Sequence, residues 1–164
     1  MKQTVPYPRW LGAILVIVTT LATAYAAPAP DFELPTKAGS VVSLQSMRGQ
    51  VVYVDFWASW CKPCRKSFPW MNTLQAKYRD KGLQIVAVNV DSDLEQVKRF
   101  LEKYPADFVV AYDTDGKVAS LYQVKGMPSS YLIDKQGNLH ASHIGFREED
   151  KVTVETQIKQ LLQN

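Results

Sequence analysis

Short apolar runs alternate along the chain with stripes of apolar residues at helical spacing. Residues 51–57 (VVYVDFW) and 83–91 (LQIVAVNVD) are apolar on both faces, which is typical of strands buried inside a sheet. Between these runs, a helical stripe predicts a helix from about Cys61 to Lys81 that stops at Gly82. The stripe consists of Phe68, Met71, Leu74 and Tyr78.

The second half of the chain continues this alternation. A capping-box pattern at Ser92 and Glu95 predicts the start of a second helix, whose stripe consists of Leu94, Val97, Leu101 and Tyr104. A third strand follows at residues 107–113 and a short helix at 116–124. Two strands at residues 129–134 and 138–145 are joined by a turn at KQGN, and a final helix lies around 154–162. This order predicts an α/β fold with helices around a mixed sheet. Residues 31–44 could supply an extra hairpin.

The first 26 residues have the layout of a secretory signal. Lys2 and Arg9 precede an apolar run at residues 11–24, and small residues follow at Ala24 and Ala26. A membrane span needs about 20 apolar residues, which is longer than this run. We therefore expect cleavage after Ala26 and export to an oxidising space such as the periplasm, with an uncleaved membrane anchor as the alternative.

Length and charge narrow the class of function. Residues 27–164 are enough for one domain with its own core, so the two cysteines are not needed as a structural staple. The formal net charge of +3 falls to +1 once Lys2 and Arg9 are removed with the first 26 residues. The chain has no basic block, so we expect no nucleic-acid partner. It also has no phosphate loop and no Ser/His/Asp grouping. We expect a monomer.

The two cysteines, Cys61 and Cys64, lie in the segment WASWCKPCRKSFP between a predicted strand and a predicted helix. The helix N-terminus and the charge of Lys62 both lower the pKa of a thiol at Cys61, which predicts the nucleophile there. Cys64 lies one turn further inside and is predicted to be the more buried, resolving thiol. Pro63 suits a first helical turn and stiffens the ring. Trp60, beside the nucleophile, is predicted to be partly exposed.

These motifs resemble the TlpA-like (ResA-like) extracytoplasmic thiol–disulfide oxidoreductases of the thioredoxin superfamily. The matching segments are VDFWASWCKPCRKSFP, IVAVNVD and GMPSSYLIDKQG. The resemblance implies a thioredoxin fold with an N-terminal β-hairpin and a central helix–strand insertion. It also implies a redox-active Cys61–Cys64 disulfide with no other cofactor, and a cis peptide at Met127–Pro128 beside it. In that family the residue at Met127 offers backbone groups to an incoming substrate strand.

One departure from the family pattern bears on proton transfer. Asp55 lies inside a buried strand where TlpA-like proteins commonly have Asn, and Ser67 stands where many of them have Glu. Burial of a carboxyl group raises its pKa, so Asp55 is predicted to accept the proton of Cys64. The alternative is a structural carboxylate that pairs with a lysine or turns toward solvent.

The leading hypothesis is a reductant of disulfides in envelope proteins. The resemblance implies apocytochrome c as one substrate and a membrane thiol transporter of the DsbD or CcdA kind as electron donor. The alternative is a thioredoxin-fold copper chaperone that uses the same two thiolates, and a peroxidase is a third class. His140 and His143 are three residues apart on a predicted strand and should face opposite sides, so we expect no metal site there.

Overall fold

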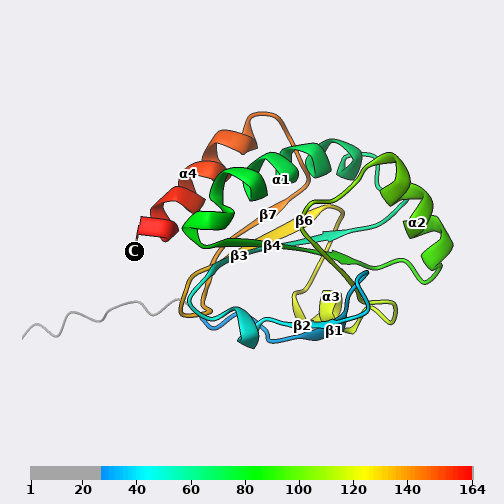
Figure 1. The fold of residues 1–164 in the computed structure, drawn as a ribbon, viewed down its shortest axis with the longest axis horizontal. Helices are drawn as coiled ribbons and strands as arrows, with labels where there is room; N and C mark the ends of the chain where they lie inside the picture. The colour runs from blue at the N-terminus through cyan, green and yellow to red at the C-terminus, as the bar shows by residue number, and fades with distance from the viewer. Residues whose placement is uncertain (1–26, 164) are drawn as a thin grey trace, which may run out of the picture.

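Five strands form a mixed central sheet in the order β5-β4-β3-β6-β7 (Figure 1). The first three run parallel to one another, and β6 and β7 are antiparallel to their neighbours. Their bounds are Val51–Trp57 (β3), Leu83–Asn89 (β4), Val109–Tyr112 (β5), Ser129–Ile133 (β6) and Leu139–Ile144 (β7). The computed structural model describes residues 27–163, so the predicted signal sequence lies outside the described residues. Among residues 27–163, no helix has the length and apolar character that crossing a membrane requires.

Helices and a separate hairpin cover the two faces of this sheet. Figure 1 shows three helices on one face: α1 (Cys64–Tyr78), α2 (Leu94–Lys103) and α4 (Asp150–Gln163). The short helix α3 (Lys117–Leu121) and the antiparallel pair β1 (Glu33–Pro35) and β2 (Val41–Ser43) lie on the other face. This order of elements confirms the predicted fold class, with the N-terminal hairpin present and with α2 and β5 as the central helix–strand segment after β4.

The central strand β3 divides the core into two clusters because its side chains alternate between the faces. Tyr53 and Trp57 point toward α1, where Trp57, Phe68 and Phe100 stack with ring centroids 4.6–5.0 Å apart. On the other face, Phe56, Tyr122 and Tyr131 pack with centroids 4.9–5.7 Å apart. Both clusters consist of buried residues, so the end of β3 is packed on both faces where the loop that follows it begins.

The bounds of α1 differ from the prediction at both ends. The helix begins at Cys64 and not at Cys61, because Cys61 forms a turn with Ala58 and the first helical hydrogen bonds reach back only to Lys62 and Pro63. At the other end, α1 stops at Tyr78 and a 3₁₀ turn follows over Arg79–Lys81. Gly82 then ends the segment with φ +97°, as the sequence predicts.

The start of α2 corrects a second prediction. The N-cap is Asp93, whose carboxylate accepts the Glu95 N–H at 3.0 Å, and Ser92 does not cap the helix. Leu94 is 47% exposed, although the stripe predicted it on the buried face. Phe100, which is not part of the predicted stripe, lies on the buried face of α2 and packs against Trp57 and Phe68.

Candidate active site

Cys61 and Cys64 lie where β3 turns into α1. The Cys61 N–H donates to the Ala58 carbonyl at 3.0 Å and closes a tight turn just after Trp57. The two cysteines form a disulfide with their Cα atoms 5.4 Å apart. Because the sequence separation is only three, this bond contributes little loop-closure stabilisation to the fold. Its placement suits a bond that opens and closes.

The surroundings of Cys61 favour a negative charge on its sulfur. The Cys64 N–H donates to Cys61 Sγ at 3.2 Å, and this N–H belongs to the first residue of α1. Lys62, Arg65 and Lys66 are exposed nearby, and the first turn of the helix has no acidic residue. Unpaired helix N–H groups and positive charge both lower the pKa of a thiol. Cys61 therefore keeps the predicted electropositive environment although the helix begins three residues after it.

The two sulfurs differ in their access to solvent. Cys64 is completely buried, and Cys61 retains 3% of its exposure. Trp60 stands 66% exposed beside Cys61, as predicted for a partly exposed residue next to the nucleophile. Lys62 and Pro63, between the cysteines, are exposed. Trp60 is thus the exposed side chain beside the pair, and Cys61 is the cysteine that keeps a small exposed fraction.

The Met127–Pro128 peptide is cis, as the resemblance implies. Met127 is half-buried and packs against the cluster of core residues that contains both cysteines. Pro128 leads directly into β6, which is the antiparallel neighbour of β3. The structure therefore brings the loop before β6 to the same part of the molecule as the disulfide.

Asp55 is a buried carboxyl group on the same side of the sheet as the disulfide. It lies between Tyr53 and Trp57 in β3, and both of these residues pack in the cluster that contains Cys61 and Cys64. The residue is 2% exposed, and its Oδ2 atom has no hydrogen-bond partner. Desolvation by burial raises the pKa of Asp55 well above its usual value.

The neighbours of Asp55 across the sheet do not neutralise it. Ala87 stands opposite it on β4, and Ser130 stands opposite it on β6. Among residues 27–163, Asp55 takes part in no ion pair, so neither the paired lysine nor the solvent-facing carboxylate of the alternative prediction is found. Tyr53 also has a raised pKa, first because of burial and second because of the charge of Asp55.

A buried polar network that the sequence analysis missed holds the loop in front of Cys61. The Asp91 carboxylate accepts the Ser59 N–H at 2.7 Å, the Ser59 hydroxyl at 2.8 Å and the Asn89 amide at 2.7 Å. The Asn89 side chain in turn accepts the Asp91 N–H at 3.0 Å. Asp91 is 8% exposed and Asn89 is completely buried. These bonds tie the end of β4 to the loop that carries Trp60 and Cys61.

The comparisons with known proteins agree with this arrangement. Residues 24–160 match the model of the family described as Redoxin. The chain belongs to the redoxin family. This redoxin is 38% identical over 133 residues to the thiol-disulfide oxidoreductase ResA of Bacillus anthracis, covering 81% of this chain and 76% of the relative.

Solved structures give the same classification. A Chlorobium tepidum protein described as a "putative Thiol:disulfide interchange protein DsbE" superimposes with a TM-score of 0.81 at 54% identity, covering 84% of this chain and 96% of that one. A second Chlorobium tepidum structure, of a thioredoxin-family thiol:disulfide interchange protein, has a TM-score of 0.75 at 28% identity, covering 86% and 99%. The chain is thus a thiol–disulfide oxidoreductase of the ResA/DsbE type with a thioredoxin fold.

The two histidines of β7 have different surroundings. His143 bonds to Gln157 of α4 at 3.0 Å, and His140 is exposed. A register shift in the pairing of β6 with β7 breaks the strict alternation predicted for this strand. As a result, Ala141 packs on the α1 side of the sheet and Leu139 packs on the other side. Within residues 27–163, no group of three or more histidine, cysteine or acidic side chains could hold a metal ion.

Proposed function

We propose that this redoxin reduces disulfides of envelope proteins outside the cytoplasm, with Cys61 as nucleophile and Cys64 as resolving thiol. The observation that carries the proposal is the contrast between the two sulfurs. Cys61 receives an N–H from the start of α1 and lies among exposed cations, whereas Cys64 is completely buried. The thiolate is the attacking species, so the sulfur whose negative charge is stabilised and reachable attacks first.

The reaction then follows in two balanced steps. The Cys61 thiolate attacks one sulfur of the partner disulfide, so that a mixed disulfide forms and the other partner sulfur leaves as a thiolate. Cys64 loses its proton and attacks Cys61 Sγ, which releases the second partner thiolate. The partner gains two electrons, and its two thiolates take up one proton that comes from Cys64 and one from solvent. The protein is left with the Cys61–Cys64 disulfide.

Asp55 is proposed as the acceptor of the Cys64 proton, directly or through a water molecule. Its carboxyl group lies on the disulfide side of the sheet, and burial raises its pKa above the usual value, which makes its ionised form a stronger base. Ser67, one turn beyond Cys64, is buried and donates its hydroxyl to the Cys64 carbonyl at 3.2 Å. Asp55 is therefore the acidic group proposed for this step.

The compartment and the partners are inferred from sequence and relatives. The signal-like residues 1–26 and the disulfide support an oxidising location such as the periplasm. The family resemblance favours the reductant direction, with the disulfide between the haem-site cysteines of apocytochrome c as one substrate and a membrane thiol transporter of the DsbD or CcdA kind as donor. Trp60, Met127 and Pro128 are proposed to contact the substrate.

Trapping of mixed disulfides tests the roles of the two cysteines. Cys64→Ser should accumulate envelope proteins linked to Cys61, because the resolving thiol is gone. Cys61→Ser is the matched control and should trap few or none. Equal trapping by both variants would show that the assignment of nucleophile and resolving thiol is wrong. The reduction potential of the couple, measured against glutathione, tests the proposed direction.

The role of Asp55 has its own kinetic test. Asp55→Asn should slow resolution of a preformed mixed disulfide while leaving alkylation of Cys61 unchanged. General-base assistance contributes about 10²–10⁴-fold, and a thiol needs less of it than an alcohol, so we expect the low end. Adding Ser67→Glu to Asp55→Asn should recover part of the rate, because residue 67 lies one turn from Cys64 on the same side of α1. Resolution at the wild-type rate from pH 6 to 9 in Asp55→Asn would contradict this role.

A further inference from the structure

Asp55 is enclosed by the core, so a proton that it takes up has to travel before it reaches solvent. The residue is 2% exposed and belongs to β3, the middle strand of the five-stranded sheet. As the proposed acceptor for Cys64, it must release one proton before it can accept another. Its neighbours across the sheet therefore decide on which side a polar route to solvent exists.

Asp55, Ser130 and His143 stand directly opposite one another on three neighbouring strands. Asp55 of β3 pairs with Ser130 of β6, and Ser130 pairs with His143 of β7. Directly opposite side chains of antiparallel strands lie on the same face of the sheet, with Cβ atoms about 4.5–5.5 Å apart. A carboxyl group, a hydroxyl group and an imidazole thus follow one another from the middle strand to β7, which is an edge strand.

This row lies on the face of the sheet that carries the disulfide. Leu132, two residues after Ser130, belongs to the core cluster that contains both cysteines, and Ala141, two residues before His143, packs against it. His143 also bonds to Gln157 of α4, a helix that covers this face in Figure 1. The row and the proposed acceptor of the Cys64 proton therefore share one side of the molecule.

Ser130 is buried among polar groups of β3. It is 4% exposed, and the nearby Tyr53 is 3% exposed. Burial and the charge of Asp55 raise the pKa of Tyr53, and a side-chain hydrogen bond with Ser130 opposes this rise. A serine hydroxyl can accept one proton while it donates another. Ser130 therefore has the chemistry to pass a proton from Asp55 to the next strand.

His143 connects the row with the surface. The residue is half-buried, and its Nε2 atom lies 3.0 Å from Oε1 of Gln157. An amide oxygen only accepts hydrogen bonds, so Nε2 carries a hydrogen and Nδ1 is the ring nitrogen that can take up a proton. Nδ1 is bonded to the ring carbon next to Cβ, so it is the nitrogen nearer to the strand. Histidine is the residue type that exchanges protons most readily near neutral pH.

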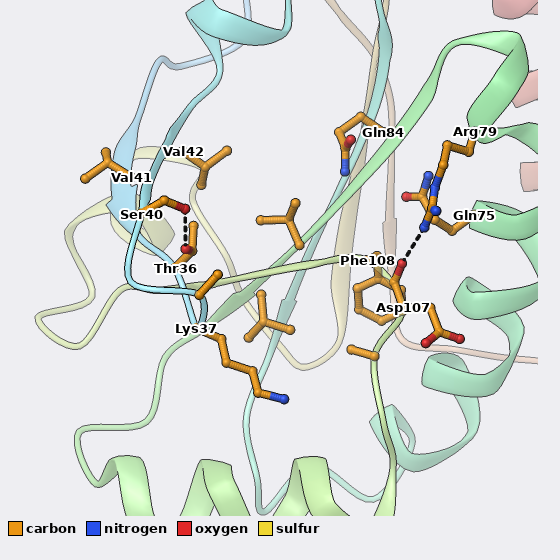
Figure 2. Close-up of a pocket in the computed structure, with 14 residues that line it drawn as sticks. Thr36, Lys37, Ser40, Val41, Val42, Gln75, Arg79, Gln84, Asp107 and Phe108 are labelled. Carbon is orange, nitrogen blue, oxygen red and sulfur yellow. Dashed lines mark hydrogen bonds between the residues drawn. The ribbon is translucent and has the colours of Figure 1, made fainter.

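The opposite direction across the sheet offers no such route. From Asp55 the row continues through Ala87 of β4 to Val110 of β5. Val110 lines a pocket of about 580 Å³ between the N-terminal hairpin and the end of α1, which Figure 2 shows in close-up. The side chains of alanine and valine cannot pass a proton, so this row gives Asp55 no polar connection to that pocket.

We propose that Asp55 exchanges its proton with solvent along the row Ser130–His143, which ends at the β7 edge. The Asp55 carboxyl group gives its proton to Ser130 Oγ while the Ser130 hydroxyl proton passes to His143 Nδ1. The imidazolium then releases one proton to water, and Asp55 is left as a carboxylate. One proton leaves the core and no electron moves. The importance of this route for turnover rests on the proposed function of Asp55, whereas the exchange itself does not.

Infrared spectroscopy of the oxidised protein in D₂O tests the route. At about pH 6, exposed carboxyl groups are ionised, whereas Asp55 keeps its proton because burial raises its pKa well above the usual value. The carbonyl band of this protonated carboxyl group is identified by its absence in Asp55→Asn. After dilution into D₂O, the shift of the band reports how fast a deuteron replaces the proton.

Two substitutions interrupt the row, and each has a matched control. Ser130→Ala and His143→Phe should each slow the exchange about 10²-fold, the lower end of what a positioned proton-transfer group contributes. Ser129→Ala removes an equally buried serine of β6 that stands opposite Phe56 on the other face. His140→Phe removes an exposed imidazole of the same strand. Both controls should exchange at the wild-type rate.

Combining Ser130→Ala with His143→Phe should slow the exchange no further than either change alone, because both interrupt one route. A wild-type exchange rate in either single variant, or an equal slowing in Ser129→Ala, would overturn the proposal. The kinetic test of Asp55 is separate. If Asp55→Asn resolves mixed disulfides normally while Ser130→Ala slows the exchange, Asp55 is not the acceptor but the route stands. In the reverse case the acceptor stands and the route is wrong.

Discussion

Replacing Asp91 with Ala should loosen the loop that presents Cys61. The Asp91 carboxylate accepts three hydrogen bonds, two from Ser59 and one from Asn89, at 2.7–2.8 Å. Truncation removes this acceptor and leaves a completely buried Asn89 amide and the Ser59 N–H without their partner. The loop would then be held mainly by the Val90 N–H, which donates to the Trp57 carbonyl at 3.1 Å.

The size of the effect follows from the number and kind of these bonds. A hydrogen bond to a charged group contributes about 1.5–3 kcal/mol, so three bonds set an upper bound of about 5–9 kcal/mol. Ser59 is half-buried and lines an open hollow beside Trp60, so water can replace part of the lost acceptor. We therefore expect Asp91→Ala to lower the free energy of unfolding by about 3 kcal/mol.

Two gentler substitutions and one control make this prediction specific. Asp91→Asn keeps the shape of the side chain. Its carbonyl oxygen can still accept a hydrogen bond, and its amide can donate to the Ser59 hydroxyl. The free energy of unfolding should therefore fall by only about 1 kcal/mol. Ser59→Ala removes one bond and should cost about 1.5 kcal/mol. Asp93→Ala removes the N-cap of α2, with a cost of about 1 kcal/mol and no effect on the Cys61 loop.

Urea unfolding and thiol alkylation provide the assays. Unfolding midpoints of the oxidised proteins give the stability changes, and the pH profile of Cys61 alkylation in the reduced proteins reports the environment of the nucleophile. Asp91→Ala should alter that profile, whereas Asp93→Ala should not. A stability loss below about 0.5 kcal/mol in Asp91→Ala, or an unchanged alkylation profile, would refute the role assigned to the network.

Two further predictions concern carboxyl groups whose pKa values are shifted in opposite directions. Burial raises the pKa of Asp55 in the folded state. Above about pH 3.8 the unfolded chain loses this proton, whereas the folded protein retains it up to its raised pKa. The free energy of unfolding therefore falls as pH rises through this range. Asp55→Asn should therefore gain stability over the wild type at pH 8 relative to pH 4, as measured by urea midpoints. Hydrogen bonds from Lys77 and Tyr78 lower the pKa of Glu155 to about 2, so its contribution is present above about pH 4.5 and lost as pH falls through 2. Because the partly exposed group is screened by solvent, Glu155→Gln should cost only about 1 kcal/mol at pH 7, and this cost should shrink as pH falls toward 2. An equal cost at pH 7 and pH 2 would contradict the argument.

Much of the fold could be predicted because buried strands and amphipathic helices have strong sequence patterns. The run at residues 51–57 is buried at every position, as its apolar character on both faces indicates. The ends of the helices were less predictable. Cys61 has a helix-start sequence around it, yet a hydrogen bond from its N–H to the Ala58 carbonyl draws it into a turn. Such competition between a turn and a first helical turn depends on the strand that precedes it, which local patterns do not describe.

The candidate site was predictable where its residues are adjacent in the chain and unpredictable where they are not. The CxxC segment carries its own information, and Asp55 stands out as a charged residue inside an apolar run. Asp91 and Ser59 are 32 residues apart, and their contact arises only because β3 and β4 are parallel neighbours that end side by side. A usable indication was present, since Asn89 and Asp91 flank the end of a buried strand, where polar residues meet the ends of neighbouring strands.

The ionisable groups near the disulfide bear on the direction of electron flow that is proposed for this protein. Lys62, Arg65 and Lys66 favour the Cys61 thiolate, which speeds attack but also stabilises the reduced protein and so makes the couple more oxidising. Asp55 lies on the disulfide side of the sheet, and burial favours the neutral form of its carboxyl group. In the proposed reductant, Lys62, Arg65 and Lys66 thus act on the Cys61 thiolate, and the ionised form of Asp55 is proposed to take up the Cys64 proton.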